Sequence, residues 1–566
     1  MPGTWQPLTN QPTFQACTML LLTDGSVFCN AYYSSGDCWR LRPDAFGSYV
    51  NGTWNKLAPM SGARLFYASA VLADGRVFVS GGEYWNAAKI WTTDTAVYDP
   101  MLNRWTAVTP PAGWTRVGDA PCCVLSDGRV IVGNVNSRKT AIFDPATNTY
   151  SAGPDKNDTT SEEESWTLMA DGTVLVPECD DHPKAEKYDP GSNTWVSAGT
   201  LPVDLVQAGN DEIGPAVLLP DGRAFCTGAT GANALYASGA NPTDPGTWTA
   251  GPSFPDDGTG HSLQAKDAPA CLLPNGRVLC AVGPASSGGY GSPTTFVEYD
   301  PPTNTFLNVP APANAAGNPY DHRMLLLPNG QVLLSASTND IQVYTPDGDP
   351  EEDWRPTITA FPAHVRNKQT YLISGRQFNG VSQAVAYGDD ATSATNYPII
   401  RIRSDVDGRE YYCRTFDHST MGVATGAAMV STSFKVPFNV PHGKADLVVI
   451  ANGIASDPVD ITVGPWLLHF PVNEGLVNRL IGSLADGPLW VLGPNGPVPV
   501  DPGWGEIAKE AEGAWKQIRA GVRTLTELGE KVNQIQLNEK PAQVKLVAKE
   551  TKGKGATTGK GGRIKR

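Results

Sequence analysis

An apolar run, a two-residue polar turn and a second apolar run recur seven times in the N-terminal part of the chain. The turns are Asp-Gly or Asn-Gly, at intervals of 44 to 54 residues, and begin at Asp24, Asp74, Asp127, Asp171, Asp221, Asn275 and Asn329. These dipeptides favour the type I′ hairpin turn, which needs a positive φ at both central residues. Each repeat is therefore predicted to contain a two-stranded hairpin.

Two aromatic positions follow each hairpin and predict two further strands. The first set is Tyr49, Tyr98, Phe143, Tyr188, Tyr236, Tyr299 and Tyr344, and the second is Trp54, Trp105, Tyr150, Trp195, Trp248, Phe306 and Trp354. Four antiparallel strands per repeat are the signature of a propeller blade, so we expect a seven-bladed β-propeller over residues 1–354. Trp5 predicts an outer strand that closes the ring on the last blade, although Trp354 competes for that place. A β-solenoid or a series of small sandwiches is the alternative.

Short alternating strands continue beyond the repeats. About seven such runs, TYLISGRQF and KADLVVIANG among them, lie in residues 355–465 and predict an immunoglobulin-like β-sandwich. Residues 466–502 are rich in Pro and Gly and are expected to form a linker with at most one short helix, near 473–485. The fold class expected for the body of the chain is all-β.

The pattern changes to a helical period over residues 503–536. Apolar residues recur there at steps of three and four, and Trp515, Ile518, Val522 and Leu525 belong to the resulting stripe. This amphipathic helix either docks on its own chain or contacts a protein partner or a second copy, because the stripe is close to a heptad repeat. Residues 537–566 carry nine bases against two acids and are expected to be a disordered basic tail, either a solvated one or one that docks a partner.

Charge and cysteine usage narrow the function classes. The chain has 43 Lys and Arg against 57 Asp and Glu, and the +7 of the tail leaves −21 on the other residues. No aromatic residue interleaves the basic tail, so there is no specific signal for nucleic acid. The ten Cys form no CxxC pair and are expected to be reduced. With no basic, apolar leader and no apolar run long enough for a membrane span, we expect a cytoplasmic protein or one exported by a non-Sec route.

Acidic residues recur where the innermost strand of each blade begins. Ring symmetry would gather these carboxylates at one mouth of the central channel, where like charges raise one another's pKa or recruit a cation. Oxygen ligands suit Ca²⁺, and a cationic or hydroxyl-rich ligand is an alternative. The plainer interpretation is that the carboxylates cap backbone N–H groups. Seven to nine residues before each turn the repeats hold, in order, Cys17, Phe66 with Tyr67, Asp119, Glu163 with Glu164, Glu212, Asp267, and Asp321 with His322.

Two other polar groups have simpler interpretations. Asp180, Asp181 and His182 follow a strand and are best explained as a solvated turn. His418 lies in a Ser/Thr-rich loop of the sandwich and is more typical of a hydrogen-bonded structural residue than of a metal ligand. The sequence has no GxSxG, P-loop, HExxH or paired zinc-ligand motif.

A seven-bladed propeller followed by an immunoglobulin-like domain resembles the galactose oxidase / glyoxal oxidase superfamily. Its blades are of the kelch type, with paired glycines that are clear here at Gly81-Gly82. The segment AVAYGDDATSATNYPIIRIR resembles the start of the C-terminal domain of that superfamily, and DHSTMGVATG resembles a motif of bacterial kelch proteins with this domain.

The resemblance implies a copper radical site built from a crosslinked Cys and Tyr, an axial Tyr and two His. Cys17, Tyr67 and Tyr320 lie at or near the corresponding positions. The first His position is occupied by Asp321, with His322 one residue further on, and the second falls near Ala391 with no His nearby. Copper needs both imidazoles as nitrogen donors, so a working copper site is not expected.

Three functions follow as hypotheses. The first is a non-catalytic scaffold that binds a protein, a glycan or another ligand at its mouth or rim, with the C-terminal helix and tail docking a partner. The second is a copper radical oxidase acting on alcohols or aldehydes through Cys17, Tyr67, Tyr320 and His322. The third is a carboxylate-based enzyme that uses Asp119 and Asp267.

Overall fold

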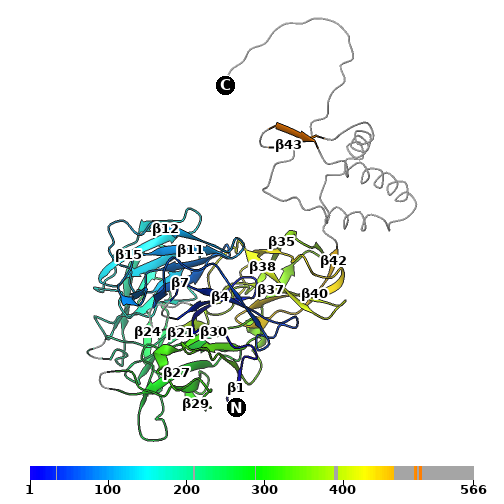
Figure 1. Cartoon of the computed structure of the whole chain (residues 1–566). Coiled ribbons are helices and arrows are strands. Elements are labelled where there is room, and N and C mark those ends of the chain that lie inside the picture. Colours follow the sequence, from blue (N-terminus) through cyan, green and yellow to red (C-terminus); the bar gives the residue numbers. More distant parts are fainter. Residues whose placement is uncertain are drawn as a thin grey trace, which may run out of the picture. The chain divides into compact units, whose positions relative to one another are not determined.

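The computed structural model describes residues 1–464, except 33–34, 208, 210, 287–288 and 388–392, together with the backbone of 490–493 and 496–499 (Figure 1). The regular elements in these residues are strands, apart from two 3₁₀ turns, η1 (Pro319–Asp321) and η2 (Glu352–Trp354). Seven four-stranded antiparallel units follow one another along the chain, and a nine-stranded sheet comes after them. The predicted all-β class, a seven-bladed propeller followed by a sandwich, is confirmed.

Each of the first six blades contains four strands in chain order, and their inner strands are buried. Blades 1 to 3 are β2 (Ala16–Leu21), β3 (Val27–Ala31), β4 (Cys38–Arg42) and β5 (Thr53–Lys56); β7 (Ala68–Val71), β8 (Val77–Ser80), β11 (Thr95–Asp99) and β12 (Arg104–Val108); and β13 (Cys122–Val124), β14 (Val130–Asn134), β15 (Ser137–Asp144) and β16 (Thr149–Ala152). Blades 4 to 6 are β17 (Thr167–Leu168), β18 (Val174–Pro177), β19 (Lys184–Asp189) and β20 (Thr194–Thr200); β21 (Ala216–Leu218), β22 (Arg223–Thr227), β23 (Asn233–Ala237) and β24 (Thr247–Ala250); and β26 (Ala270–Leu272), β27 (Val278–Pro284), β28 (Thr295–Asp300) and β29 (Thr305–Val309).

Three short strands accompany blade 2 and one accompanies blade 6. Next to blade 2, β6 (Arg64–Leu65), β9 (Tyr84–Trp85) and β10 (Ala88–Lys89) form a separate sheet. In blade 6, β25 (Leu263–Gln264) pairs with β27. Both additions lie beside the segments that lead into the inner strands.

The N-terminal strand closes the ring. Blade 7 consists of β30 (Arg323–Leu326), β31 (Val332–Ser335) and β32 (Gln342–Thr345), and its outer strand is β1 (Thr4–Pro7). Trp5 lies opposite Tyr344, with ring centroids 4.7 Å apart, and 5.1 Å from the ring of Phe296 in blade 6. Trp354 lies in η2, outside the blade, so the closing position belongs to Trp5. Pairing of β1 with β32 removes an exposed sheet edge.

The hairpin turns differ from the predicted type I′ geometry. In each of the seven turns the glycine has a positive φ, as in Gly25 at 74°, whereas the preceding Asp or Asn does not. In blade 1 the Gly25 N–H donates to the Leu22 carbonyl over 2.9 Å, and the Leu22 N–H donates to the Ser26 carbonyl. Asp24 Oδ1 accepts the Ser26 N–H at 3.1 Å. The loops are therefore three-residue hairpins with a left-handed glycine, and the Asp or Asn holds them by a side-chain hydrogen bond.

The C-terminal sandwich is a continuous path of antiparallel strands with one parallel pair. The order is β33-β35-β39-β38-β37-β40-β42-β34, with β41 on β40. Strand β38 joins two sheets, because its first half pairs with β37 and its second half with β39. The strands are β33 (Thr357–Ala360), β34 (His364–Arg366), β35 (Thr370–Arg376), β37 (Ile399–Ser404), β38 (Glu410–Phe416), β39 (Val430–Lys435), β40 (Gly443–Ala451), β41 (Ile454–Ala455) and β42 (Val459–Gly464).

A segment between two sandwich strands joins the propeller. Strand β36 (Val385–Ala386) pairs with β26, the innermost strand of blade 6, and the Leu272 N–H donates to the Ala384 carbonyl over 2.7 Å. The same segment contacts blade 4, where the Leu168 N–H donates to Gln383 Oε1 over 2.9 Å. The hydroxyl of Tyr397 donates to the Leu21 carbonyl in blade 1. The sandwich is thus anchored at the inner strands of three blades.

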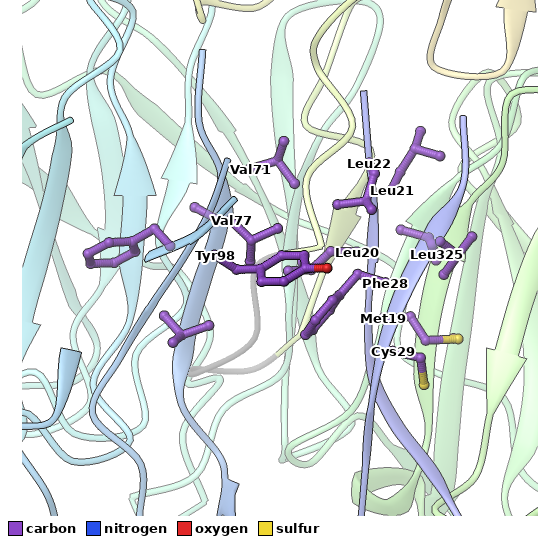
Figure 2. Close-up of a cluster of buried hydrophobic side chains, with 14 of the residues drawn as sticks. Met19, Leu20, Leu21, Leu22, Phe28, Cys29, Val71, Val77, Tyr98 and Leu325 are labelled. Atoms are coloured by element: carbon purple, nitrogen blue, oxygen red, sulfur yellow. The ribbon is translucent and has the colours of Figure 1, made fainter. Parts of the chain in front are cut away.

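The largest apolar core is shared between blades and with the sandwich. Figure 2 shows Leu20 and Phe28 of blade 1 beside Tyr98 of blade 2, with Leu325 of blade 7 close by. Tyr397 and Ile450 of the sandwich belong to the same buried cluster. The ten cysteines are all free and buried.

The chain divides into two compact units, Met1–Gly464 and Pro465–Arg566. In the second unit, β43 (Trp490–Gly493) and β44 (Gly496–Pro499) form a hairpin inside the segment that we expected to be a linker. The sequence Pro-Asn-Gly after an apolar run, which also occurs in blades 6 and 7, was a signal for it. The short helix near 473–485, the helix over 503–536 with Trp515, Ile518, Val522 and Leu525, and the tail over 537–566 lie outside the described residues. Within the described residues, no helix has the length and apolarity of a membrane span.

Candidate functional site: the axial mouth of the propeller

In three of the seven blades the position that leads into the inner strand has an uncommon backbone conformation. Phe66, Glu163 and Asp267 lie eight residues before the turn Asp or Asn of blades 2, 4 and 6, and their φ angles are 49°, 60° and 47°. Non-glycine residues seldom adopt positive φ, and such strain concentrates at functional sites. Blades 2, 4 and 6 therefore hold their strand-entry side chains in a conformation that ordinary strand geometry would not select.

Five residues of blades 5 to 7 form a compact group, which we call the mouth cluster: Glu212, Lys266, Asp267, Tyr290 and Tyr320. The Tyr290 hydroxyl donates a hydrogen bond to Glu212 Oε1. The Lys266 Nζ lies 4.5 Å from the centroid of the Tyr290 ring, a cation–π distance. The rings of Tyr290 and Tyr320 are 4.5 Å apart and inclined by 58°.

Burial and charge perturb the ionisable members of the cluster. Burial lowers the pKa of the Lys266 ammonium, and the negative charges of Glu212, Asp267 and Glu163 oppose this shift. Burial raises the pKa of Glu212, opposed by the Tyr290 hydrogen bond and by Lys266. The structure thus brings three of the recurring carboxylates within electrostatic reach of one ammonium group. Perturbed ionisable groups of this kind are typical of functional sites.

Other recurring residues lie near this group or elsewhere. Burial raises the pKa of Asp321, and burial together with the charge of Asp321 raises the pKa of Tyr32 to about 12. Asp119 is buried, and its charge reaches Lys89. Glu164 is a correction to the expected ring, because it forms a buried ion pair with Lys156 and accepts the Trp166 indole N–H at 3.0 Å.

Two members of the mouth cluster were missed by sequence reasoning. Lys266 directly precedes Asp267 in KDAPAC, where blade 3 has GDAPCC, so comparison of the two repeats contained a signal for it. Tyr290 lies in the loop between β27 and β28, outside the repeated pattern. Its place beside Glu212 follows from the path of that loop and has no counterpart in the sequence periodicity.

The described residues do not support a metal at the mouth. They contain no group of three or more His, Cys, Asp or Glu arranged to hold a metal ion, so the Ca²⁺ expectation finds no support there. The Asp180 group has local partners, since Thr160 donates to Asp180 Oδ2 at 3.0 Å and His182 Nδ1 lies 2.8 Å from Asp204 Oδ2. Hydrogen bonds to neighbouring segments of the chain account for these side chains.

The donor set does not fit copper. Burial raises the pKa of Tyr67 and the charge of Cys17 raises it further, so the two side chains lie near each other. His322, however, is fully buried, with Nδ1 3.0 Å from the Asn318 carbonyl and Nε2 3.2 Å from the Asn314 carbonyl. Both ring nitrogens therefore face backbone oxygens and neither lone pair is available to a metal.

Two further groups weigh against copper. The buried guanidinium of Arg323 lies 3.6 Å from the Tyr387 ring and is close enough to lower the pKa of Asp321, so it would repel a bound cation. His418 lies in the sandwich with Nδ1 2.9 Å from Thr432 Oγ1, and burial lowers its pKa to about 3. His418 is thus a structural histidine.

Comparisons with known proteins agree with the blade architecture. No protein-family model matches the chain. Kelch-like protein 35 of Mus musculus is 26% identical over 265 residues, which are 43% of this chain and 40% of that protein. Kelch-like protein terF of Aspergillus terreus is 34% identical over 84 residues, 14% of this chain and 17% of that protein. The propeller is of the kelch type.

The other matches are partial or distant. N-acetylneuraminate epimerase of Yersinia enterocolitica is 28% identical over 179 residues, 30% of this chain and 42% of that protein. The chain thus spans less than half the length of each of these curated relatives. Among solved structures, a fungal alcohol oxidase of the AA5 family in complex with copper has a TM-score of 0.48 at 15% identity, over 82% of this chain and 100% of that one.

Proposed function

We propose that this kelch-type propeller is a non-catalytic binding protein, galactose-oxidase-like in architecture, whose mouth cluster binds a hydroxyl-rich ligand such as a glycan. The observation that carries the proposal is the convergence of Glu212, Lys266 and two tyrosine rings on one small region. Sugar hydroxyls both donate and accept hydrogen bonds, and the cluster offers a carboxylate acceptor and an ammonium donor. Tyrosine rings present apolar surface with a polar tip, as mixed ligands require.

The names of the relatives add limited support. One of the relatives is N-acetylneuraminate epimerase, and its name refers to a sugar acid. This agrees with a sugar as the class of ligand without identifying it.

Binding of glycans to the full chain tests the proposal. A glycan array identifies ligands, and titration calorimetry measures their affinity for the wild type, for Lys266→Met and for Glu212→Gln. We expect each substitution to weaken binding by about tenfold or more, because charged hydrogen bonds are the strong ones. The exposed Glu351→Gln is the matched control and should bind as the wild type does. Absence of glycan binding, or equal binding by the mouth variants and the control, would contradict the proposal.

The proximity of Cys17 and Tyr67 keeps a copper radical oxidase as the second candidate. Such an enzyme crosslinks a cysteine to a tyrosine, which removes one titratable thiol. We expect all ten cysteines to react with a thiol reagent after denaturation, since all ten are free. One missing thiol, confirmed by intact mass, together with a radical absorption band after copper loading would favour the oxidase.

We also propose that residues 503–536 and the basic tail 537–566 dock a partner. The protein would meet this partner in the cytoplasm or after export by a non-Sec route. The charge of the tail is opposite to that of the rest of the chain, so an acidic protein surface is its natural partner. Light scattering of the full chain and of a chain ending at residue 502 tests whether the segment also makes a second copy bind. The same oligomeric state for both chains would leave only a heterologous partner for residues 503–536.

A further inference from the structure

Blade 2 carries an extra hairpin that reaches the edge of the mouth. Strand β9 pairs with β6, and β9 and β10 are joined by Asn86 and Ala87, whose φ angles of 49° and 67° fit a type I′ turn. The hairpin is therefore a defined element. It presents the next residues, Ile90 and Trp91, at the surface, and 54% of Ile90 is exposed.

An open hollow lies next to this hairpin. It has a volume of about 510 Å³ and is lined by Lys89, Ile90, Trp91, Thr115 and Arg116, which we call the rim hollow. The charge of Lys89 lowers the pKa of Glu162, which burial raises, and Asp119 in turn acts on Lys89. The rim hollow thus borders the acidic mouth but is lined by residues of opposite charge.

The two cations of the rim hollow flank one indole ring. The guanidinium carbon of Arg116 lies 5.2 Å from the centroid of the Trp91 ring, and Lys89 Nζ lies 5.7 Å from it. Lys89 pairs with Glu83 over 2.6 Å. Arg116 donates to Asn136 Oδ1 at 2.8 Å, and among the described residues no carboxylate pairs with it.

Arg116 thus has no carboxylate partner among the described residues, although the chain has a net charge of −14. A guanidinium offers a planar fork of N–H donors that matches a carboxylate in two parallel hydrogen bonds. Here Asn136 takes one donor and the Trp91 ring orients the plane, which leaves other donors available to a ligand. The exposed Ile90 adds apolar surface beside them and Thr115 adds a hydroxyl.

We propose that the rim hollow is a binding site for a carboxylate-bearing sugar, with Arg116 holding the carboxylate and Ile90 and Trp91 supporting the apolar side of the ring. Aromatic and aliphatic surface alone would accept neutral sugars, so the cation supplies the selectivity. The site is separate from the mouth cluster and does not rest on the function proposed for it.

Ligand-observed NMR and calorimetry with glucuronate and glucose test this site in the full chain. The two sugars differ in the carboxylate, so glucuronate is expected to bind about tenfold more tightly or better. Arg116→Gln should remove that preference, and Trp91→Leu should weaken glucuronate binding while the fold, checked by circular dichroism, is kept. Arg104→Gln, on the exposed outer strand of blade 2, is the matched control and should change nothing.

The results of these experiments distinguish this site from the mouth cluster and from a site for simple anions. Glycans that bind the mouth are identified separately, and the sensitivity of their binding to Lys266→Met distinguishes failure at the mouth from failure at the rim. Equal binding of glucose and glucuronate, no binding of glucuronate, or an Arg116→Gln variant that keeps the preference would overturn the proposal. If inorganic phosphate binds the rim hollow as tightly as glucuronate does, the hollow is a simple anion site. That result would overturn the proposal that its ligand is a sugar.

Discussion

The buried charges of blade 4 show how single residues are fixed by their partners. Lys156 and Glu164 are almost completely buried and form an ion pair, and Lys156 Nζ also lies 3.5 Å from Glu186 Oε1. One ammonium therefore faces two carboxylates. Glu186 is further held by the Asn157 N–H at 2.8 Å. Glu178, which is 5% exposed, lies within reach of Glu186 and Asp158, and burial and these charges raise its pKa to about 8.

The raised pKa values predict that stability falls as pH rises. Burial raises the pKa of Glu164, like that of Glu178, from 4.5 to about 8. Between these values the folded chain binds more protons than the unfolded chain, so the free energy of unfolding decreases as pH increases through this window. Glu178→Gln should remove part of that slope and stabilise the protein by about 1 kcal/mol or more above about pH 8. Urea unfolding at several pH values measures the free energy of unfolding and its pH dependence, with the exposed Glu351→Gln as control. An unchanged slope in Glu178→Gln would show that Glu178 does not carry the dependence.

At the residue scale the sequence predicted which residues lead into the inner strands better than it predicted which side chains they contact. The recurring offset before each turn located Glu163, Glu212 and Asp267, because blade symmetry places equivalent residues around one axis. It did not separate Glu163 from its neighbour Glu164, which points into the buried cluster with Lys156. The difference arises because Glu163 has a positive φ, and the sequence contains no direct signal for that conformation.

At the element scale the N-terminal strand β1 closes the ring from a largely exposed position. It is a four-residue outer strand whose main apolar contact is Trp5 with Tyr344 and Phe296. The sequence predicted its role because the aromatic repeat needed one more outer strand. It predicted a strand in the run SQAVAYG, which contains β36, but assigned that strand to the sandwich. The pairing with blade 6 was missed because the partner strand β26 lies more than a hundred residues earlier.

Loss of the Trp5 side chain is expected to loosen the ring. Trp5→Ala removes the aromatic contacts between β1 and blades 6 and 7 and should destabilise the protein by about 2–3 kcal/mol, less than a fully buried tryptophan would. The freed edge of β32 would favour association between molecules. Thermal unfolding and sedimentation measure the two effects. Trp114→Ala is a half-buried control outside the closing strand, and an equal effect of both substitutions would contradict a special role for β1.

The segment that carries β36 is held by one buried side chain of the sandwich. Asn452 Oδ1 accepts the N–H groups of Val381 and Ser382 at 2.9 and 3.2 Å, and Asn452 Nδ2 donates to the Ser382 carbonyl at 3.0 Å. Asn452→Ala leaves these buried groups without partners and should cost about 2–4 kcal/mol. Urea unfolding measures the loss, with Asn439→Ala at an exposed position as control. A loss below about 1 kcal/mol would show that water replaces the side chain.

At the scale of the whole molecule, the propeller and the sandwich share one apolar core. Tyr397, Ile399 and Ile450 of the sandwich belong to the same buried cluster as the inner strands of blades 1 and 2. Two chain segments cross between the parts, at the connection after η2 and through β36. The sequence predicted both folds but not this joint core, because the contacts connect residues that are hundreds of positions apart and follow no common period.

The shared core predicts that residues 1–464 unfold in one step. A chain ending at Gly464 retains the whole first compact unit, so its thermal transition should be as cooperative and at the same temperature as that of the full chain. Truncation after Gln536 should likewise leave this transition unchanged. A chain ending at residue 356 would lack the sandwich, expose the apolar surface around Leu21 and Leu325, and aggregate. Calorimetry with fluorescence of the many tryptophans measures the transitions. Two separate steps in the chain ending at Gly464, or a stable monomer ending at residue 356, would show that the propeller folds independently of the sandwich.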